Sequence, residues 1–149
     1  MAPAPAEPAA ILPPDLSALG LGVPEIVEAR GSDSLWTEGM YVDGAVAEYS
    51  VNAEVVLWMA ALRYGSSWAA GNEFEGYVAW AEENCGRSSY VTLGGWGRIE
   101  CEAWGGYNKT FRQGIWIVDV VATGAGPVPP RQLVDSARDA LAQHWKTLD

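Results

Sequence analysis

The sequence predicts an α+β fold, in which one antiparallel sheet of about six strands carries two helices packed on one face. Segments rich in β-branched and aromatic residues lie between turn signals, as strands do. Two other segments carry apolar residues at helical spacing. The order strand, turn, strand, loop, helix occurs twice, about 61 residues apart. This order indicates a strand-strand-helix pseudo-repeat and a layer of helices on a sheet.

Length and charge restrict the function classes. A chain of 149 residues has the size of one domain, and its 49% hydrophobic content suits a folded core. The net charge of −10 repels phosphate backbones and anionic lipids, so we expect no nucleic-acid partner. The sequence has no apolar run of about 18 residues, so we expect no transmembrane span.

Residues 1–14 are expected to be a flexible, Ala/Pro-rich N-terminal tail, and residues 15–149 a single α+β domain. Pro3, Pro5 and Pro8 favour extended, solvated backbone. The segment lacks the charged and apolar regions of a signal peptide. Tails of this kind often join an exported domain to a leader or an anchor, so a membrane tether through an upstream leader stays open.

The first half of the domain is predicted to be mostly strand. Pro24–Ala29 alternates weakly and has proline at its first residue, which edge strands tolerate. Leu35–Val42 and Ala45–Val51 are rich in β-formers, and the Asp43-Gly44 pair between them is a strong hairpin signal. Asn52-Ala53 is a weaker turn. We therefore expect two strands joined by a tight turn at Asp43-Gly44.

The segment Glu54–Tyr64 fits either a long buried strand or a helix capped by Asn52. Its apolar residues would occupy both faces of a strand, and a turn signal precedes it. We favour the strand and leave the helix open.

Two helices are predicted. The first begins at Asn72, with Glu75 three residues later in the pattern of a capping box, and ends near Cys85, before Gly86. The second covers residues 132–146 and has an apolar stripe that includes Leu133 and Leu141. Between them, strand patterns cover residues 90–93, 97–104, 108–113 and 115–122.

Two independent patterns place both cysteines in the layer between sheet and helix. Cys85 lies on the apolar stripe of the first helix, and period-2 alternation puts Cys101 on the apolar face of its strand, with Ile99. We predict a Cys85–Cys101 disulfide, which implies an oxidising compartment. The alternative is two buried free thiols. Two cysteines and the single histidine, His144, are too few for a structural zinc site, and we expect no metal and no cofactor.

The other face of the Cys101 strand carries the candidate ligand site. Alternation places two tryptophans at its ends and charged residues between them, a set that stacks on flat ligands and forms directional hydrogen bonds. The residues are Trp96, Arg98, Glu100, Glu102 and Trp104. Alternatively, Arg98 pairs with its acidic neighbours, or the tryptophans pack on loops or at an assembly interface.

We therefore expect an extracytoplasmic, non-catalytic binding or accessory domain whose partner is an unknown protein or small ligand. One alternative is a structural subunit docked in a larger extracytoplasmic complex. The other is a secreted hydrolase that uses Glu100 and Glu102, whose positions on one strand stand about 7 Å apart, within the range of glycosidase pairs. No residue is assigned a catalytic role, because the sequence has no nucleophile motif to accompany His144.

Overall fold

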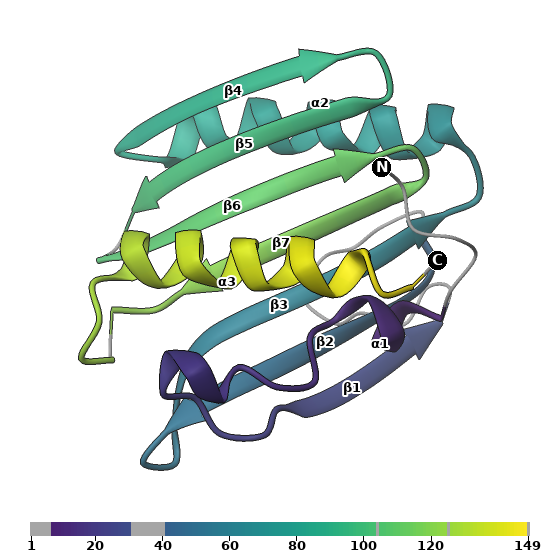
Figure 1. Ribbon diagram of the computed structural model, residues 1–149. Coiled ribbons are helices and arrows are strands. Elements are labelled where there is room, and N and C mark those ends of the chain that lie inside the picture. Colours follow the sequence, from purple (N-terminus) through teal and green to yellow (C-terminus); the bar gives the residue numbers. More distant parts are fainter. Residues whose placement is uncertain (1–6, 31–40, 104, 125, 149) are drawn as a thin grey trace.

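The computed structural model describes residues 7–30, 41–103, 105–124 and 126–148, and it has one seven-stranded antiparallel sheet (Figure 1). The strand order is β1-β2-β3-β7-β6-β5-β4. The strands are β1 Glu25–Arg30, β2 Tyr41–Val51, β3 Glu54–Tyr64, β4 Arg87–Leu93, β5 Trp96–Ala103, β6 Gly106–Gln113 and β7 Trp116–Ala122. The helices are α1 Pro8–Ile11, α2 Ser67–Asn84 and α3 Pro130–Trp145, with a 3₁₀ turn at Ser17–Leu19. The predicted α+β class and antiparallel sheet are confirmed, with one more strand than expected.

The two long helices cover opposite faces of the sheet, so the prediction that both pack on one face is wrong. Val118 and Val120 of β7 share a core cluster with Val134 of α3, whereas Ile117 shares a second cluster with Phe74 of α2. Neighbouring residues of a strand point to opposite faces. Figure 1 accordingly shows α3 in front of the sheet and α2 behind it. Strand β7 carries apolar residues on both faces, and a helix covers each of them.

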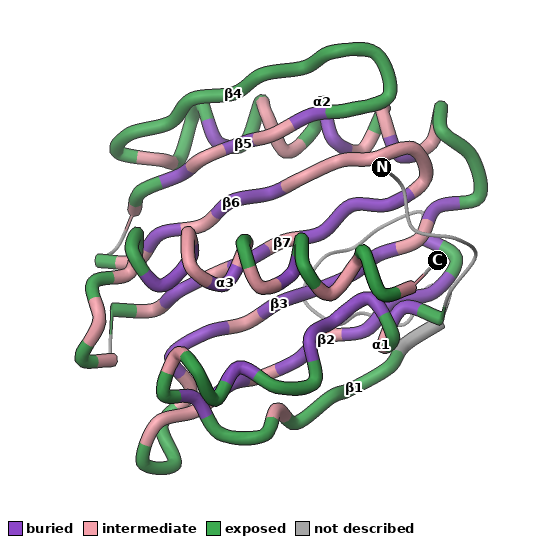
Figure 2. The backbone as a smooth tube through the Cα atoms, in the orientation of Figure 1, coloured by how far each residue is buried: buried purple, intermediate pink, exposed green. Residues whose placement is uncertain are grey.

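The pseudo-repeat is present in the order of the elements. Strands β2 and β3 precede α2, and strands β6 and β7 precede α3. The two hairpins meet where β3 pairs with β7 in the centre of the sheet. Figure 2 shows this centre buried and β4, at one edge, exposed along its length.

Strand β3 runs from Glu54 to Tyr64, which confirms the strand over the helix. Leu57 and Met59 belong to the core cluster on the α3 side, and Leu62 belongs to the cluster on the α2 side. A strand covered on both faces is apolar at nearly every position, which is why its pattern resembled that of a buried helix.

The predicted hairpin at Asp43-Gly44 is wrong, because β2 continues through both residues to Val51. Asp43 instead pairs with Arg63 of β3, whose Nε donates to Oδ1 at 2.8 Å. The chain turns at Asn52-Ala53, where φ is 52° and 67°. Positive φ at both central residues is the geometry of a tight hairpin. Most of the predicted strand Leu35–Val42 lies outside the described residues.

Helix α2 starts at Ser67, before the predicted cap at Asn72. The Oγ of Ser66 accepts a hydrogen bond from the amide of Ala69 at 3.0 Å, which is a typical N-cap. The helix ends at Asn84, and Cys85 is its C-cap. The apolar stripe extends back to the buried Ala70, one turn before Phe74, so packing lengthens the helix beyond the capping-box signal.

The tail predicted over residues 1–14 is wrong for residues 8–13, which pack against the domain. Ile11 and Leu12 lie fully in the core on the α3 side. The hydroxyl of Tyr49 donates to the carbonyl of Pro13 at 2.7 Å. Nε2 of His144 lies 2.7 Å from the carbonyl oxygen of Ala10 and ties α1 to α3. None of the helices in the described ranges is long and apolar enough to cross a membrane.

Gly97 of β5 sets how closely α2 approaches the sheet. A Cβ atom at this position would come within 2.5 Å of the ring of Phe74, which is itself buried. We expect Gly97→Ala to lower the free energy of unfolding by about 1–3 kcal/mol, because Phe74 and α2 must shift. Urea denaturation measures the change. Gly95→Ala is the matched control, because a Cβ there meets no atom within 4 Å; equal stability of the two variants would contradict the prediction.

Candidate functional site: a pocket beneath helix α2

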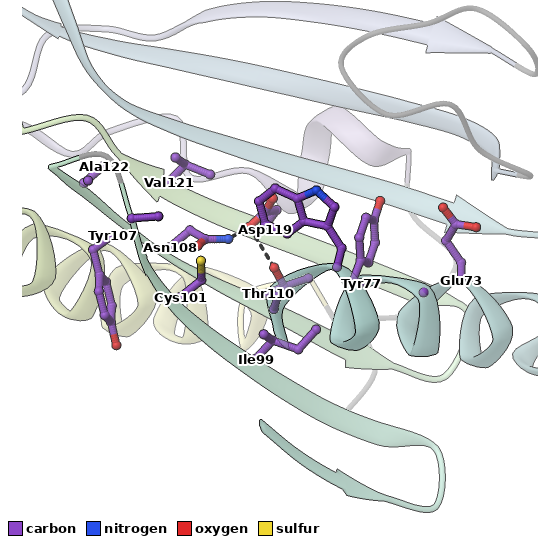
Figure 3. Close-up of a pocket in the computed structure, with 15 residues that line it drawn as sticks. Glu73, Tyr77, Ile99, Cys101, Tyr107, Asn108, Thr110, Asp119, Val121 and Ala122 are labelled. Atoms are coloured by element: carbon purple, nitrogen blue, oxygen red, sulfur yellow. Dashed lines mark hydrogen bonds between the residues drawn. The ribbon is translucent and has the colours of Figure 1, made fainter. Parts of the chain in front are cut away.

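A cavity of about 700 Å³ lies between α2 and the sheet, on the face opposite α3. Its volume is within the range of small-molecule sites. Residues of α2 line one side of it, and residues of β5, β6 and β7 line the other (Figure 3). The sheet therefore forms the floor of the cavity and the helix forms a wall.

The local sequence explains why this space stays open. Glu73, Gly76, Tyr77 and Trp80 lie at helical spacing along one side of α2, and Gly76 adds no side chain to that wall. Small residues line the cavity on the sheet side, where the strands meet their turns: Ala103, Gly106 and Ala122. A cavity remains because neither layer fills the space between the larger side chains.

Asp119 of β7 is the polar centre of the pocket. It faces the same side as Ile117 and Val121, and β6 places Thr110 opposite it. Thr110 Oγ1 donates to Asp119 Oδ1 at 3.0 Å, and Asn108 Nδ2 donates to the same oxygen at 3.5 Å. Figure 3 shows the three side chains pointing toward one another. Burial raises the pKa of Asp119 to about 6, and these hydrogen bonds only partly offset that effect.

Glu73 is the second carboxyl of the pocket, on the α2 wall. Partial burial raises its pKa above the ordinary value. Tyr77 lies one turn further along the helix, and Trp80 follows. Carboxyl groups on a mostly apolar and aromatic lining suit recognition of a small molecule with one polar group.

The predicted disulfide is confirmed, and it borders the pocket. Cys85 at the end of α2 bonds to Cys101 of β5, with their Cα atoms 5.5 Å apart. Cys101 and Ile99 both line the cavity. The covalent bond therefore fastens α2 to the floor beside the pocket.

The predicted ligand face of β5 lies on the other side of the sheet, toward α3. Trp96 is 38% exposed, Arg98 and Glu100 are half-buried and Glu102 is exposed. Trp104 lies outside the described residues. The structure thus places four of the five residues along one strand face, as the alternation predicted, but none of them reaches the pocket. Their role in ligand binding stays a prediction.

Glu100 is paired within the protein. Its Oε1 lies 3.2 Å from Nζ of Lys109, whose ammonium also bonds Asp135 of α3 at 2.6 Å. Burial raises the pKa of Glu100, but the hydrogen bond and charge of Lys109 outweigh this and hold it below its ordinary value. A carboxyl that stays ionised does not serve as a general acid at neutral pH, and this pairing weighs against the hydrolase alternative.

Sequence reasoning missed the pocket residues Glu73, Tyr77, Trp80, Asn108, Thr110 and Asp119. One signal was present in β7, where Asp119 is the only charged residue in the run Trp116–Ala122. A carboxyl in a strand that is buried on both faces requires hydrogen-bond partners or a function. The residues around it come from α2, β5 and β6. The order of the strands in the sheet brings these residues next to Asp119. Among the described residues, no three His, Cys, Asp or Glu side chains gather closely enough to hold a metal ion.

Comparisons with known proteins identify the fold but no family. No protein-family model and no curated protein sequence matches the chain. The extracellular domain of PknH from Mycobacterium tuberculosis is similar in structure, with a TM-score of 0.54 and 14% identity over 95% of this chain and 98% of that one. A GTP-binding regulator from Thermotoga maritima has a TM-score of 0.54 and 12% identity over 83% of this chain and 77% of that one. At these identities the likeness extends to the fold alone.

Proposed function

We propose that this chain is an extracytoplasmic, non-catalytic domain that binds a small molecule in the pocket between α2 and the sheet. The observation that carries the proposal is the cavity itself, about 700 Å³ in volume with a polar group at Asp119 and largely apolar walls. Ligand sites have this composition, with a few polar groups that fix orientation inside an apolar lining. The pocket replaces the β5 face as the first candidate site.

Two observations support the extracytoplasmic part of the proposal. The Cys85–Cys101 disulfide is of a kind that persists in oxidising compartments. The fold is similar to that of an extracellular domain, with nearly full coverage of both chains. A tether at the N-terminus would place the pocket outside a membrane, where it would meet dissolved ligands.

A pair of substitutions on α2 tests the pocket. Gly76→Phe places a ring in the cavity lining, at a position where a Cβ atom meets nothing within 4 Å. Ala79→Phe places the same ring on the exposed face of α2, outside the lining. We expect library compounds that raise the melting temperature of the wild-type protein to act equally on Ala79→Phe and to lose their effect on Gly76→Phe. A ligand at 100 times its Kd stabilises a protein by about 2.7 kcal/mol, which thermal denaturation resolves.

Circular dichroism and urea midpoints check that both variants fold like the wild type. Equal shifts of the melting temperature in both variants would place the ligands elsewhere on the protein. The absence of any stabilising compound for the wild type would remove the binding function.

Docking in a larger complex is the second candidate, and the exposed edge of the sheet favours it. Leu93 at the end of β4 is 74% exposed, and Tyr90, Val91 and Trp96 of the same hairpin are also exposed. Among the strands that the structure describes, β4 has a neighbour on one side only. Exposed edges with apolar side chains pair with other chains. If the chain docks in a larger complex, the complex buries this hairpin. The Gly76→Phe and Ala79→Phe variants should then assemble as the wild type does.

A further inference from the structure

The charge of the pocket lining indicates the class of ligand. The described residues that line the cavity include two carboxyl groups, Glu73 and Asp119, and no lysine or arginine. Among the described residues, no basic side chain forms an ion pair with Asp119. The hydrogen bonds to its carboxyl from Thr110 and Asn108 come from neutral groups. The pocket therefore holds negative charge that the described protein does not balance.

Asp119 has room to accept another donor. Thr110 and Asn108 both donate to Oδ1, and the backbone amide of Val120 also hydrogen-bonds the carboxylate. An ionised carboxylate accepts about four hydrogen bonds in all. Two other carboxylates of the sheet have basic partners: Asp43 pairs with Arg63, and Glu100 pairs with Lys109. Asp119 is half-buried, and a carboxylate that is partly removed from water is costly unless a cation lies beside it. A ligand cation would supply the partner that the described residues do not.

The walls of the pocket suit the rest of such a ligand. Ile99 and Val121 line the floor, and Tyr77 and Trp80 line the α2 side. Aromatic rings attract ammonium groups through their faces and also pack on apolar ligand bodies. The net charge of −10 raises the local concentration of cations near the protein.

We infer that the pocket binds an organic amine, with the ligand's ammonium group at Asp119 and its apolar body between α2 and the sheet. This inference rests on the proposed function, because it names the ligand class of the same site. Binding involves no covalent step. The ammonium replaces water around the carboxylate and forms a charge-assisted hydrogen bond.

Three probes with one aromatic body test the inference: 2-phenylethylamine, 2-phenylethanol and 3-phenylpropionate, which carry an ammonium, a hydroxyl and a carboxylate. Isothermal titration at pH 7.5 measures their affinities for the full chain. We expect the amine to bind at least tenfold more tightly than the alcohol, and the carboxylate to bind most weakly. Asp119→Asn is expected to bring the amine's affinity down to that of the alcohol.

Asp139→Asn is the matched control, because it removes one negative charge from the exposed surface of α3. It should leave the preference for the amine unchanged. If Asp119→Asn and Asp139→Asn lose the same affinity for the amine, then the net charge of the protein, and not Asp119, attracts it. Equal or tighter binding of the alcohol to the wild type would overturn the inference while the pocket remains a binding site. If no probe binds, the amine inference fails, and the Gly76→Phe and Ala79→Phe comparison decides the proposed function separately.

The affinity for the amine should also depend on pH. Protonation of Asp119 removes its negative charge. The Kd for the amine is therefore expected to rise below about pH 6, by up to about tenfold per pH unit. The other titratable groups around the cavity are Glu73 and Tyr77 from α2, whereas the side chain of Tyr107 points to the α3 face of the sheet (Figure 3). Burial raises the pKa of Glu73 as well, so Glu73→Gln tests its share of the profile. A flat profile from pH 5 to 8 in the wild type would contradict a carboxylate anchor.

Discussion

Replacing Cys85 and Cys101 together by alanine is expected to lower the free energy of unfolding by about 3 kcal/mol. The bond closes a short loop, with 16 residues of sequence separation, and this is the loop-entropy estimate for such a length. It also holds the end of α2 on β5, where Cys101 is buried in the core face of the strand. Loss of the bond therefore frees the helix that walls the pocket.

Urea denaturation under non-reducing conditions measures this loss of free energy. In thermal denaturation the melting temperature should fall by roughly 6–12 °C. Reduction with dithiothreitol should destabilise the wild type by a similar amount and leave the double variant unchanged. Ligand affinity in the pocket should fall as well, because α2 is less restrained. A variant as stable as the wild type, with thiols that titrate as free in the denatured wild type, would show that the disulfide does not form.

Asp119→Asn is expected to make the ligand-free protein more stable above pH 6. The pKa of Asp119 is about 6 in the folded state against an ordinary value of 3.8, so the folded protein holds this proton more tightly than the unfolded chain. The contribution of Asp119 to stability is thus present at low pH and declines as the pH rises from about 4 to about 6. Asparagine carries no charge, and its Oδ1 accepts the same bonds from Thr110 and Asn108.

The gain at pH 7.5 should be about 1–3 kcal/mol, from the size of the pKa shift. The difference should shrink as the pH falls through 3.8 and be nearly absent at pH 3.5, where Asp119 is mostly protonated in both states. Urea denaturation at pH 3.5, 5.5 and 7.5 measures the three points, with Asp139→Asn as the surface control. A loss of stability at pH 7.5 would mean that the carboxylate has a favourable partner in the folded protein. A stable variant that no longer binds amines would show that this residue serves binding at a cost in stability.

The disulfide and its strand were predictable because each depends on a local period. Cys101 and Ile99 lie two residues apart, on one face of β5, and Cys85 follows the helical stripe of Phe74 and Ala81. The two patterns are independent and both point to the core, so they predicted the pair without knowledge of the sheet order. The strand β3 was likewise predictable, since a centre strand is apolar at nearly every position.

The opposite placement of α2 and α3 was not predictable, since it depends on which face of the sheet each connection crosses. The apolar stripe of α3 fits any apolar face, and β7 offers one on each side. Asp43-Gly44 was misleading for a related reason. Its turn preference is local, but the ion pair with Arg63 and the pairing of β2 with β3 outweigh it. Only the assembled sheet decides which of several local turn signals the chain uses.

The sequence by itself determined the α+β class, the disulfide partners and most of the strands. Apolar residues that recur every 2 residues in a strand, or every 3.6 residues in a helix, show which side chains face the core. The tertiary structure decided where the pocket lies. Asp119, Thr110 and Glu73 come from β7, β6 and α2, and nothing in their spacing along the chain relates them. They meet because α2 packs across the strands from β5 to β3, between which β6 and β7 lie, and because small residues leave the space between the layers unfilled. A cavity belongs to the packing of elements that are distant in sequence, so a local pattern does not encode it.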